Sequence, residues 1–189
     1  MSPRALLGSV LSVSRDAAHH FSKPPVDAVT LLAGLGVEGD AHAGATVRHR
    51  YLVKKDPSAA NLTQVHLLQA ELFPELAARG FSVGPGELGE NVTTVGLDLL
   101  TVPVDTLVHL GDEAVVRVTG LRSPCFQING LQKGLMKAVL AKDAEGGVIR
   151  KSGIMGVVVS GGVVRPEDPI RLVLPVLSLI HISEPTRPY

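Results

Sequence analysis

The sequence is poor in cysteine, in aromatic rings and in net charge. Among 189 residues it has one cysteine, no tryptophan and 3% aromatic residues. One thiol cannot form a disulfide within the chain, which fits a reducing compartment and leaves a free thiol to be explained. Eighteen basic residues balance eighteen acidic ones. We therefore expect neither a nucleic acid nor an anionic membrane as a partner.

Long apolar segments are also absent. The longest apolar stretch, residues 154–164, is interrupted by Gly156, Gly161 and Gly162, and it is shorter than the roughly 20 helical residues that cross a bilayer. Residues 1–4 lack the basic flank that opens a secretory signal, and no apolar core with a cleavage site follows them. These features predict a cytoplasmic protein with no membrane partner.

Short runs of branched apolar residues, bounded by glycine, proline, aspartate or asparagine, recur along the chain and predict β-strands. Only two segments have helical spacing, residues 69–79 and 131–142, and Pro74 interrupts the first unless that helix begins near it. The pattern predicts a mostly β fold, a barrel or a sandwich, with a few short helices. The strand runs are residues 6–13, 26–32, 64–68, 90–95, 104–110, 114–119, 154–160 and 169–174.

The distribution of glycine and proline indicates one domain. Both residue types lie between the expected strands and form no low-complexity linker. We therefore expect a single domain over residues 1–175. Residues 176–189 follow the last strand and lack its periodicity, and the run from residue 178 is similar to translated vector sequence. We expect this tail to be non-native.

A glycine-rich segment, residues 36–44, is the first candidate for chemistry. It combines three glycines with Asp40 and His42. Glycines let backbone N–H groups approach a ligand closely, and Asp40 could orient His42 or help bind a cation. The alternative is an ordinary solvated turn. His42, His49 and His66 match no standard metal-ligand spacing, so these side chains are not expected to form a metal site.

A basic segment follows, with Arg48 and Arg50 next to Lys54 and Lys55. Arginine forks bind phosphate or carboxylate through two hydrogen bonds, and two arginines at this spacing on a strand would share one face. This segment could therefore grip an acidic ligand. The alternative is a charged edge strand that resists aggregation.

Residues 84–94 form a second glycine-rich loop, which leads into an expected strand and carries Glu90 and Asn91. Asn91 offers a donor and an acceptor, as the edge of a heterocycle requires, and Glu90 could accept from ring or exocyclic N–H groups. The alternative is a hairpin turn with surface carboxylates.

The single thiol, Cys125, lies in a proline-containing loop directly after an expected strand, three residues beyond Arg122. A nearby cation favours the thiolate, the form that attacks sulfur or binds a soft metal. The alternative is that Cys125 is a small buried apolar residue. Without a second cysteine, disulfide exchange through a resolving thiol of the same chain is excluded, so a persulfide or a metal thiolate is what a functional Cys125 could form.

Five segments, in their order along the chain, together resemble the MOSC domain, the family named after the C-terminal domain of molybdenum cofactor sulfurase. The resemblance implies a closed or partly closed β-barrel, similar to the pyruvate-kinase insert barrel, over the single domain. It also implies that the chain binds molybdenum cofactor, the phosphorylated pterin dithiolene molybdopterin with its metal, and handles sulfur through Cys125. The segments are residues 37–44, 61–67, 86–94, 120–125 and 153–169.

The same resemblance suggests roles for the candidate residues. Cys125 would carry sulfur or ligate molybdenum, and Arg122 would keep it ionised. Sulfurases release sulfur on a separate pyridoxal-phosphate domain, for which 189 residues leave no room, so we expect no pyridoxal phosphate here and a separate sulfur donor such as a cysteine desulfurase. The pterin and its phosphate would lie across Asp40, His42, Arg48, Arg50, Glu90 and Asn91.

Three functions are therefore open. The first is sulfur transfer through Cys125 to the cofactor or to another acceptor. The second is molybdenum-dependent reduction of N-hydroxylated substrates, which would need a separate electron-donor protein because one cysteine cannot hold an iron–sulfur cluster. The third is non-enzymatic storage or delivery of the cofactor.

Overall fold

The computed structural model describes residues 6–48 and 50–176, with the side chains of Leu6 and residues 50–52 outside that description. Apart from Val176, the tail expected to be non-native therefore lies outside the described residues. Within the described part, no helix combines the length and the apolar character needed to cross a bilayer.

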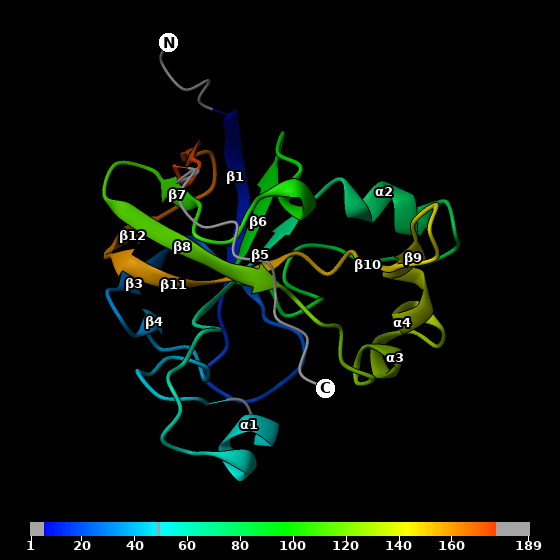
Figure 1. The fold of residues 1–189 in the computed structure, drawn as a ribbon, viewed down its shortest axis with the longest axis horizontal. Helices are drawn as coiled ribbons and strands as arrows, with labels where there is room; N and C mark the ends of the chain where they lie inside the picture. Colours follow the sequence, from blue (N-terminus) through cyan, green and yellow to red (C-terminus); the bar gives the residue numbers. More distant parts are fainter. Residues whose placement is uncertain (1–5, 49, 177–189) are drawn as a thin grey trace, which may run out of the picture.

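Seven of the described strands close into a barrel (Figure 1). Their order is β13-β7-β8-β11-β5-β6-β1, and β1 pairs again with β13. An odd ring of strands cannot be antiparallel throughout, and here β5 and β6 form the parallel pair. The predicted β fold and its closed barrel are confirmed. The strands are β1 (Leu6–Ser14), β5 (Val65–Gln69), β6 (Val92–Val95), β7 (Leu107–Leu110), β8 (Ala114–Leu121), β11 (Ile154–Ser160) and β13 (Pro169–Val173).

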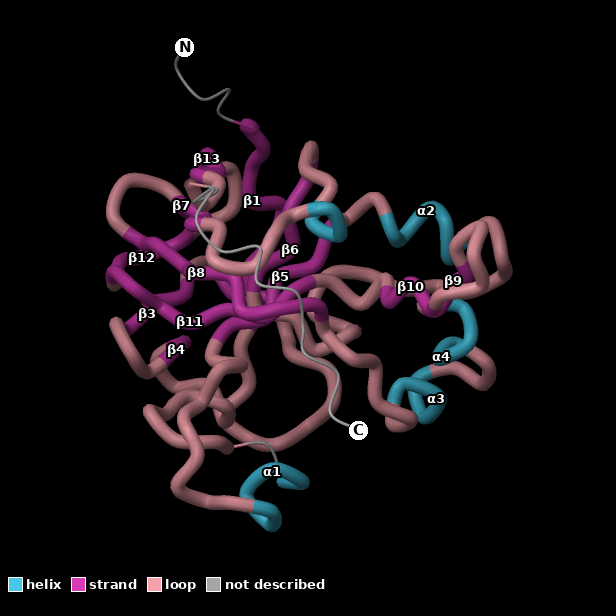
Figure 2. Tube along the Cα trace, in the orientation of Figure 1, coloured by secondary structure: helices cyan, strands magenta, loops and turns pink. Residues whose placement is uncertain are grey.

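Smaller elements surround the barrel (Figure 2). The short strand β2 (Pro25–Val26) extends the sheet beside β1, and β12 (Gly162–Val164), β3 (Val29–Leu32) and β4 (Gly36–Val37) form a three-stranded sheet. A hairpin of β9 (Leu140–Lys142) and β10 (Val148–Arg150) lies beside the helices α2 (Leu72–Ala77), α3 (Ile128–Leu131) and α4 (Leu135–Ala138). The remaining helices are α1 (Arg50–Lys55) and the 3-10 turn η1 (Leu99–Thr101).

The barrel is filled by alternating apolar side chains. On β8, Ala114, Val116 and Val118 are buried and alternate with more exposed residues, and Ile170 on β13 faces the same core. A second apolar cluster, which includes Leu72 on α2, lies under the helices. Small barrels of this kind are filled by side chains, so a ligand site must lie at an end of the barrel.

The two helix predictions have different outcomes. The helix expected over residues 69–79 is the shorter α2, and Pro74 occupies its first turn, where proline removes no intrahelical hydrogen bond. The continuous helix expected over residues 131–142 is wrong. Gly134 has a left-handed backbone (φ +88°), which separates α3 from α4, and the last three residues pair as β9.

The basic segment also differs from its prediction. The strand on which Arg48 and Arg50 would share a face is absent from the described residues, because the chain turns into α1 at Arg50. The alternative of a charged edge strand is wrong for the same reason.

Candidate functional site

Strand register brings five distant parts of the chain to one end of the barrel. Val13 pairs with Val92, Val92 with Leu67, Leu67 with Ile154, and Ile154 with Leu121. These residues form one row around the barrel, so the residues that adjoin them along the chain emerge at the same end.

Backbone hydrogen bonds extend this row into the loops. Ser14 N–H donates to Asn91 O at 2.8 Å, and Asn91 N–H donates to His66 O at 2.9 Å. Arg122 N–H donates to Gly153 O at 2.8 Å. The β-ladder therefore places Asn91, His66 and Arg122 beside one another, although they are far apart in the sequence.

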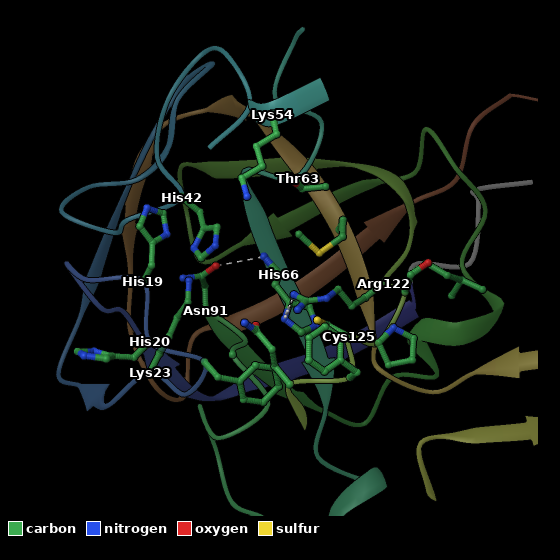
Figure 3. A pocket seen from close by; sticks show the side chains of 18 residues that line it. His19, His20, Lys23, His42, Lys54, Thr63, His66, Asn91, Arg122 and Cys125 are labelled. Atoms are coloured by element: carbon green, nitrogen blue, oxygen red, sulfur yellow. Dashed lines mark hydrogen bonds between the residues drawn. The ribbon is translucent and has the colours of Figure 1, made fainter. Parts of the chain in front are cut away.

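A cavity of about 750 Å³ opens among these loops (Figure 3). None of the described residues that line it is an aspartate or a glutamate. Cationic and imidazole side chains around such a cavity favour an anionic ligand. The titratable side chains on its wall are His19, His20, Lys23, His42, Lys54, His66, Arg122 and Cys125.

Cys125 is a free, partly exposed thiol on this wall. Its loop starts at Arg122, which is tied to the barrel, and ends where Ile128 N–H donates to Cys125 O at 3.1 Å as α3 begins. The Arg122 guanidinium lies beside Cys125 in Figure 3. Burial lowers the pKa of Arg122 from its usual value, and the charges of Cys125 and Glu90 oppose that shift. Arginine stays protonated in proteins, so Arg122 provides a fixed positive charge next to the thiol.

The buried His66 contacts the Arg122 guanidinium and helps to fix its position. Its Nε2 lies 2.6 Å from Ser152 O, and its Nδ1 lies 3.4 Å from Arg122 Nη1. Burial and the neighbouring Arg122 lower the pKa of His66 to about 3, so its imidazole is neutral. A carbonyl oxygen only accepts, so Nε2 carries the hydrogen and Nδ1 accepts from Arg122. From the sequence, His66 was weighed only as a possible metal ligand, so its contact with Arg122 was not predicted.

Asp40 lies behind the cavity wall as a buried carboxylate. Its Oδ2 accepts from Lys23 Nζ at 2.6 Å and from Asn91 Nδ2 at 3.0 Å. Its Oδ1 lies 2.9 Å from His42 N and 3.3 Å from His42 Nδ1. Burial by itself would raise the pKa of Asp40, but the hydrogen bonds from His42 and the charge of Lys23 hold it well below its usual range. Asp40 is therefore ionised and connects three cavity residues.

Glu90 is also buried and supports its own loop. Its Oε1 accepts from Gly86 N–H at 2.6 Å and from Thr93 Oγ1 at 3.0 Å, while Oε2 has no hydrogen-bond partner among the described residues. Burial raises the pKa of Glu90. This carboxyl group does not line the cavity.

The structure gathers part of the predicted site. Cys125, Arg122, His42 and Asn91 line the cavity together. Asp40 and Glu90 are not on its wall, because their oxygens face inward to protein donors. Arg48 is exposed, with its guanidinium over Gly44, and is not on the wall. The side chain of Arg50 lies outside the described residues.

Four further cavity residues had no part in the predicted cofactor site. They are Lys23, His66 and the adjacent pair His19 and His20. Of these, only His66 lies in a segment that resembles the MOSC domain. The structure brings Lys23 to the cavity through its contact with Asp40, and His66 through the barrel register. For His19 and His20, the local signal in the sequence was two histidines in succession after an expected strand. Among the described residues, no three His, Cys, Asp or Glu side chains form a group that could hold a metal ion.

The family model of the MOSC domain matches residues 39–171, which include most of the cavity wall. The chain belongs to the MOSC domain family. The matched region runs from the loop of Asp40 and His42 to β13, so the family match covers the strands whose register builds the site, except β1.

One curated protein is similar in sequence to this MOSC chain. Protein YiiM of Escherichia coli (strain K12) is 34% identical over 110 residues, which are 58% of this chain and 46% of YiiM. The chain thus spans about half the length of the curated relative that it matches.

Two solved structures show the same fold. YuaD from Bacillus subtilis has a TM-score of 0.73 at 19% identity, covering 89% of this chain and 97% of YuaD. Crystalline YiiM from Escherichia coli has a TM-score of 0.58 at 23% identity, covering 92% of this chain and 71% of YiiM.

Proposed function

We propose that this MOSC protein binds molybdenum cofactor in the cavity and handles sulfur through Cys125, as a persulfide or as a metal thiolate. The observation that carries the proposal is that the sequence's only thiol and the fixed charge of Arg122 share one cavity whose described wall has no carboxylate. The residue types on that wall suit a ligand that is both anionic and soft.

The chemical groups of the cofactor have counterparts in the cavity. A phosphate requires cations, and Lys54 from α1 and Arg122 from the end of β8 both reach the wall. A pterin edge requires paired donors and acceptors, which the amide of Gln127 on the wall can supply. Both N–H groups of the Asn91 amide already donate within the protein. A soft metal accepts a thiolate. The volume of about 750 Å³ lies within the range of cofactor sites. When bound, the cofactor supplies a metal centre at which sulfur or oxygen is exchanged.

The chain's own residues would perform the sulfur step. Arg122, held by His66, stabilises negative charge on Cys125. The Cys125 thiolate attacks the terminal sulfur of a protonated persulfide on a separate donor protein. A new S–S bond forms at Cys125, the S–S bond of the donor breaks, and the donor leaves as a thiolate. The sulfur atom and its hydrogen remain on Cys125.

One observation favours the second candidate function, reduction of N-hydroxylated substrates with electrons from a separate protein. Phe126 and Leu121 line the cavity, yet their relative exposures are 75% and 44%. Exposed apolar side chains at a polar cavity offer a surface to a planar organic substrate. A pure sulfur carrier has no need of such a surface.

Cofactor binding is the first test. The full chain, Cys125→Ser and the surface control Ser160→Ala are incubated with molybdenum cofactor, and metal and pterin are measured after gel filtration. We expect stoichiometric binding by the full chain and the control, and an altered charge-transfer spectrum in Cys125→Ser. Absence of binding by all three proteins would overturn the cofactor proposal.

The reaction is tested next on the loaded proteins. Incubation with a cysteine desulfurase and cysteine should add the mass of one sulfur atom to Cys125 in the full chain, and nothing in Cys125→Ser. If the full chain gains no sulfur but consumes an N-hydroxylated base with an added reductant, the second function replaces the first. Binding without either reaction would favour the carrier.

A further inference from the structure

The ring of His42 is held by Asp40, which does not line the cavity. This ring lies on the cavity wall, next to the ring of His19 at a centroid distance of 5.3 Å and an interplanar angle of 89°. Figure 3 shows both rings on the opposite side of the view from Cys125. Asn61 Nδ2 donates to His42 O and to Gly44 O, both at 3.0 Å, so the backbone of this loop is held as well.

The contact with Asp40 decides which ring nitrogen of His42 carries the hydrogen. Asp40 Oδ1 lies 3.3 Å from His42 Nδ1, and the carboxylate is anchored on its other oxygen by Lys23 and Asn91. An ionised carboxylate only accepts hydrogen bonds. Nδ1 must therefore donate, and in the neutral ring Nε2 then bears a lone pair.

No hydrogen bond joins His42 Nε2 to another described residue, and the ring is on the cavity wall. The charged and titratable groups around it are Asp40 and Lys23 behind the ring, His19 beside it, and Lys54 from α1 on the same cavity. The lone pair of Nε2 is therefore available to a bound molecule.

We propose that Asp40 and His42 form an acid–base dyad in which Nε2 of His42 removes a proton from an O–H, N–H or S–H group of the molecule bound in the cavity. The bond from hydrogen to the heteroatom breaks, its electron pair stays on the heteroatom, and the proton joins Nε2. Nδ1 keeps its hydrogen and its contact with Asp40, and the proton returns from Nε2 to the product. The identity of the bound molecule rests on the proposed function; the dyad itself does not.

Lys23 tunes this dyad. Because its ammonium lies 2.6 Å from Asp40, the charge of the carboxylate is already balanced when His42 is neutral. Asp40 therefore sets the tautomer and the direction of the His42 ring.

The tautomer is tested on the full chain without cofactor. Nitrogen NMR of isotope-labelled histidine, assigned with His42→Gln, should show His42 near pH 8 as the neutral form with hydrogen on Nδ1. Diethyl pyrocarbonate should acylate His42 at Nε2, located by peptide mapping, with the exposed His20 as internal reference. Hydrogen on Nε2, or an unmodified His42 beside a modified His20, would overturn the dyad.

The catalytic role is tested on loaded protein. His42→Asn and His42→Gln should bind cofactor as the full chain does. In whichever of the two reactions above the full chain catalyses, both variants should keep the substrate KM within about twofold and lower kcat by about 100-fold or more. His109→Gln, on β7 away from the cavity, is the matched control and should keep full turnover. Turnover of both His42 variants within about threefold of the full chain would contradict proton transfer by His42. If no protein binds cofactor, the proposed function fails, while the NMR result still decides the dyad.

Discussion

Asp40 determines the geometry of the cavity from a position outside it. Its two oxygens collect donors from Lys23, His42 and Asn91, which belong to three separate loops. Removing one partner of a buried ion pair leaves the other charge buried without compensation, which is strongly destabilising. Replacing both partners by apolar residues costs much less. The carboxylate is therefore a structural centre of the site as well as the partner of His42.

Replacing Asp40 alone should consequently destabilise the protein strongly. We expect Asp40→Asn to lower the free energy of unfolding by about 3 kcal/mol, because the Lys23 ammonium is left buried without its partner charge. The double variant Asp40→Asn with Lys23→Met should lose less than the sum of the two single losses. Denaturant unfolding of the four proteins measures both quantities, and simple additivity would contradict the coupling.

His66 makes stability depend on pH. Its pKa is lowered to about 3 in the folded protein, below its ordinary value of 6.5, so the unfolded chain binds the proton more readily. Stability is therefore fully present above pH 6.5 and is lost as the pH falls toward 3. Between about pH 6.5 and about pH 4.5 the loss should be about 2 kcal/mol.

The contribution of His66 to the pH dependence of the unfolding free energy is isolated by comparison with His66→Gln, whose side chain can still donate to Ser152 O. His109 has a lowered pKa, caused by burial and by Arg171, and contributes with the same sign. Glu90 has a raised pKa and contributes with the opposite sign. Both act in wild type and variant alike, so the difference between the two unfolding curves reports His66. Parallel curves over this pH range would show that the imidazole is not held neutral.

At the scale of elements, glycines decide where strands and helices can begin. Gly134 separates α3 from α4. Gly153, with φ at +81°, precedes β11, and a Cβ placed on it would lie 2.1 Å from Leu67 O on β5. The close approach of these two backbones keeps His66 next to Ser152, so Gly153 serves the site as well as the sheet.

Gly153→Ala should therefore lower the free energy of unfolding by more than the strain of its left-handed backbone alone. Gly146, in the turn between β9 and β10, has a similar φ of +84°, but a Cβ added there would meet nothing within 4 Å. We expect Gly146→Ala to lower the free energy of unfolding by about 1 kcal/mol, the strain of the left-handed backbone, and Gly153→Ala by clearly more. Equal losses in denaturant unfolding would contradict the steric argument.

At the scale of the whole molecule, the barrel depends on contacts between strands near the two ends of the chain. β1 pairs with β13 from Leu6↔Leu172 to Ser9↔Pro169, and β13 also pairs with β7. Ile170 and Leu172 of β13 are buried in the core. Removing β13 would open the ring and expose two sheet edges, whereas the described residues after it add no strand to the barrel.

Truncation tests this dependence. A chain ending at Pro175 should keep the far-ultraviolet circular dichroism and the Tm of the full chain, as the predicted domain over residues 1–175 requires. A chain ending at Asp168 lacks β13 and should not fold cooperatively. Loss of folding in the longer truncation would refute the predicted domain limit, and cooperative folding of the shorter one would show that closure is dispensable.

The fold class and the single thiol follow from the sequence alone. In β8 and β13, buried residues alternate with more exposed ones, as expected for runs of branched apolar residues that form strands. The β prediction is confirmed for this reason. The helix expected over residues 131–142 is wrong because a 3.6-residue spacing of apolar residues cannot show where the backbone turns left-handed, as it does at Gly134.

The set of residues that share the cavity follows only from the tertiary structure. His66 meets Asn91 across a sequence separation of 25 residues and Ser152 across 86, through strand pairing that no local pattern encodes. Asp40 and Glu90 were predicted from the sequence to bind the cofactor, yet both carboxylates face inward, because buried backbone and side-chain donors require acceptors. Local sequence limits what each segment can form, and long-range register decides which side chains meet.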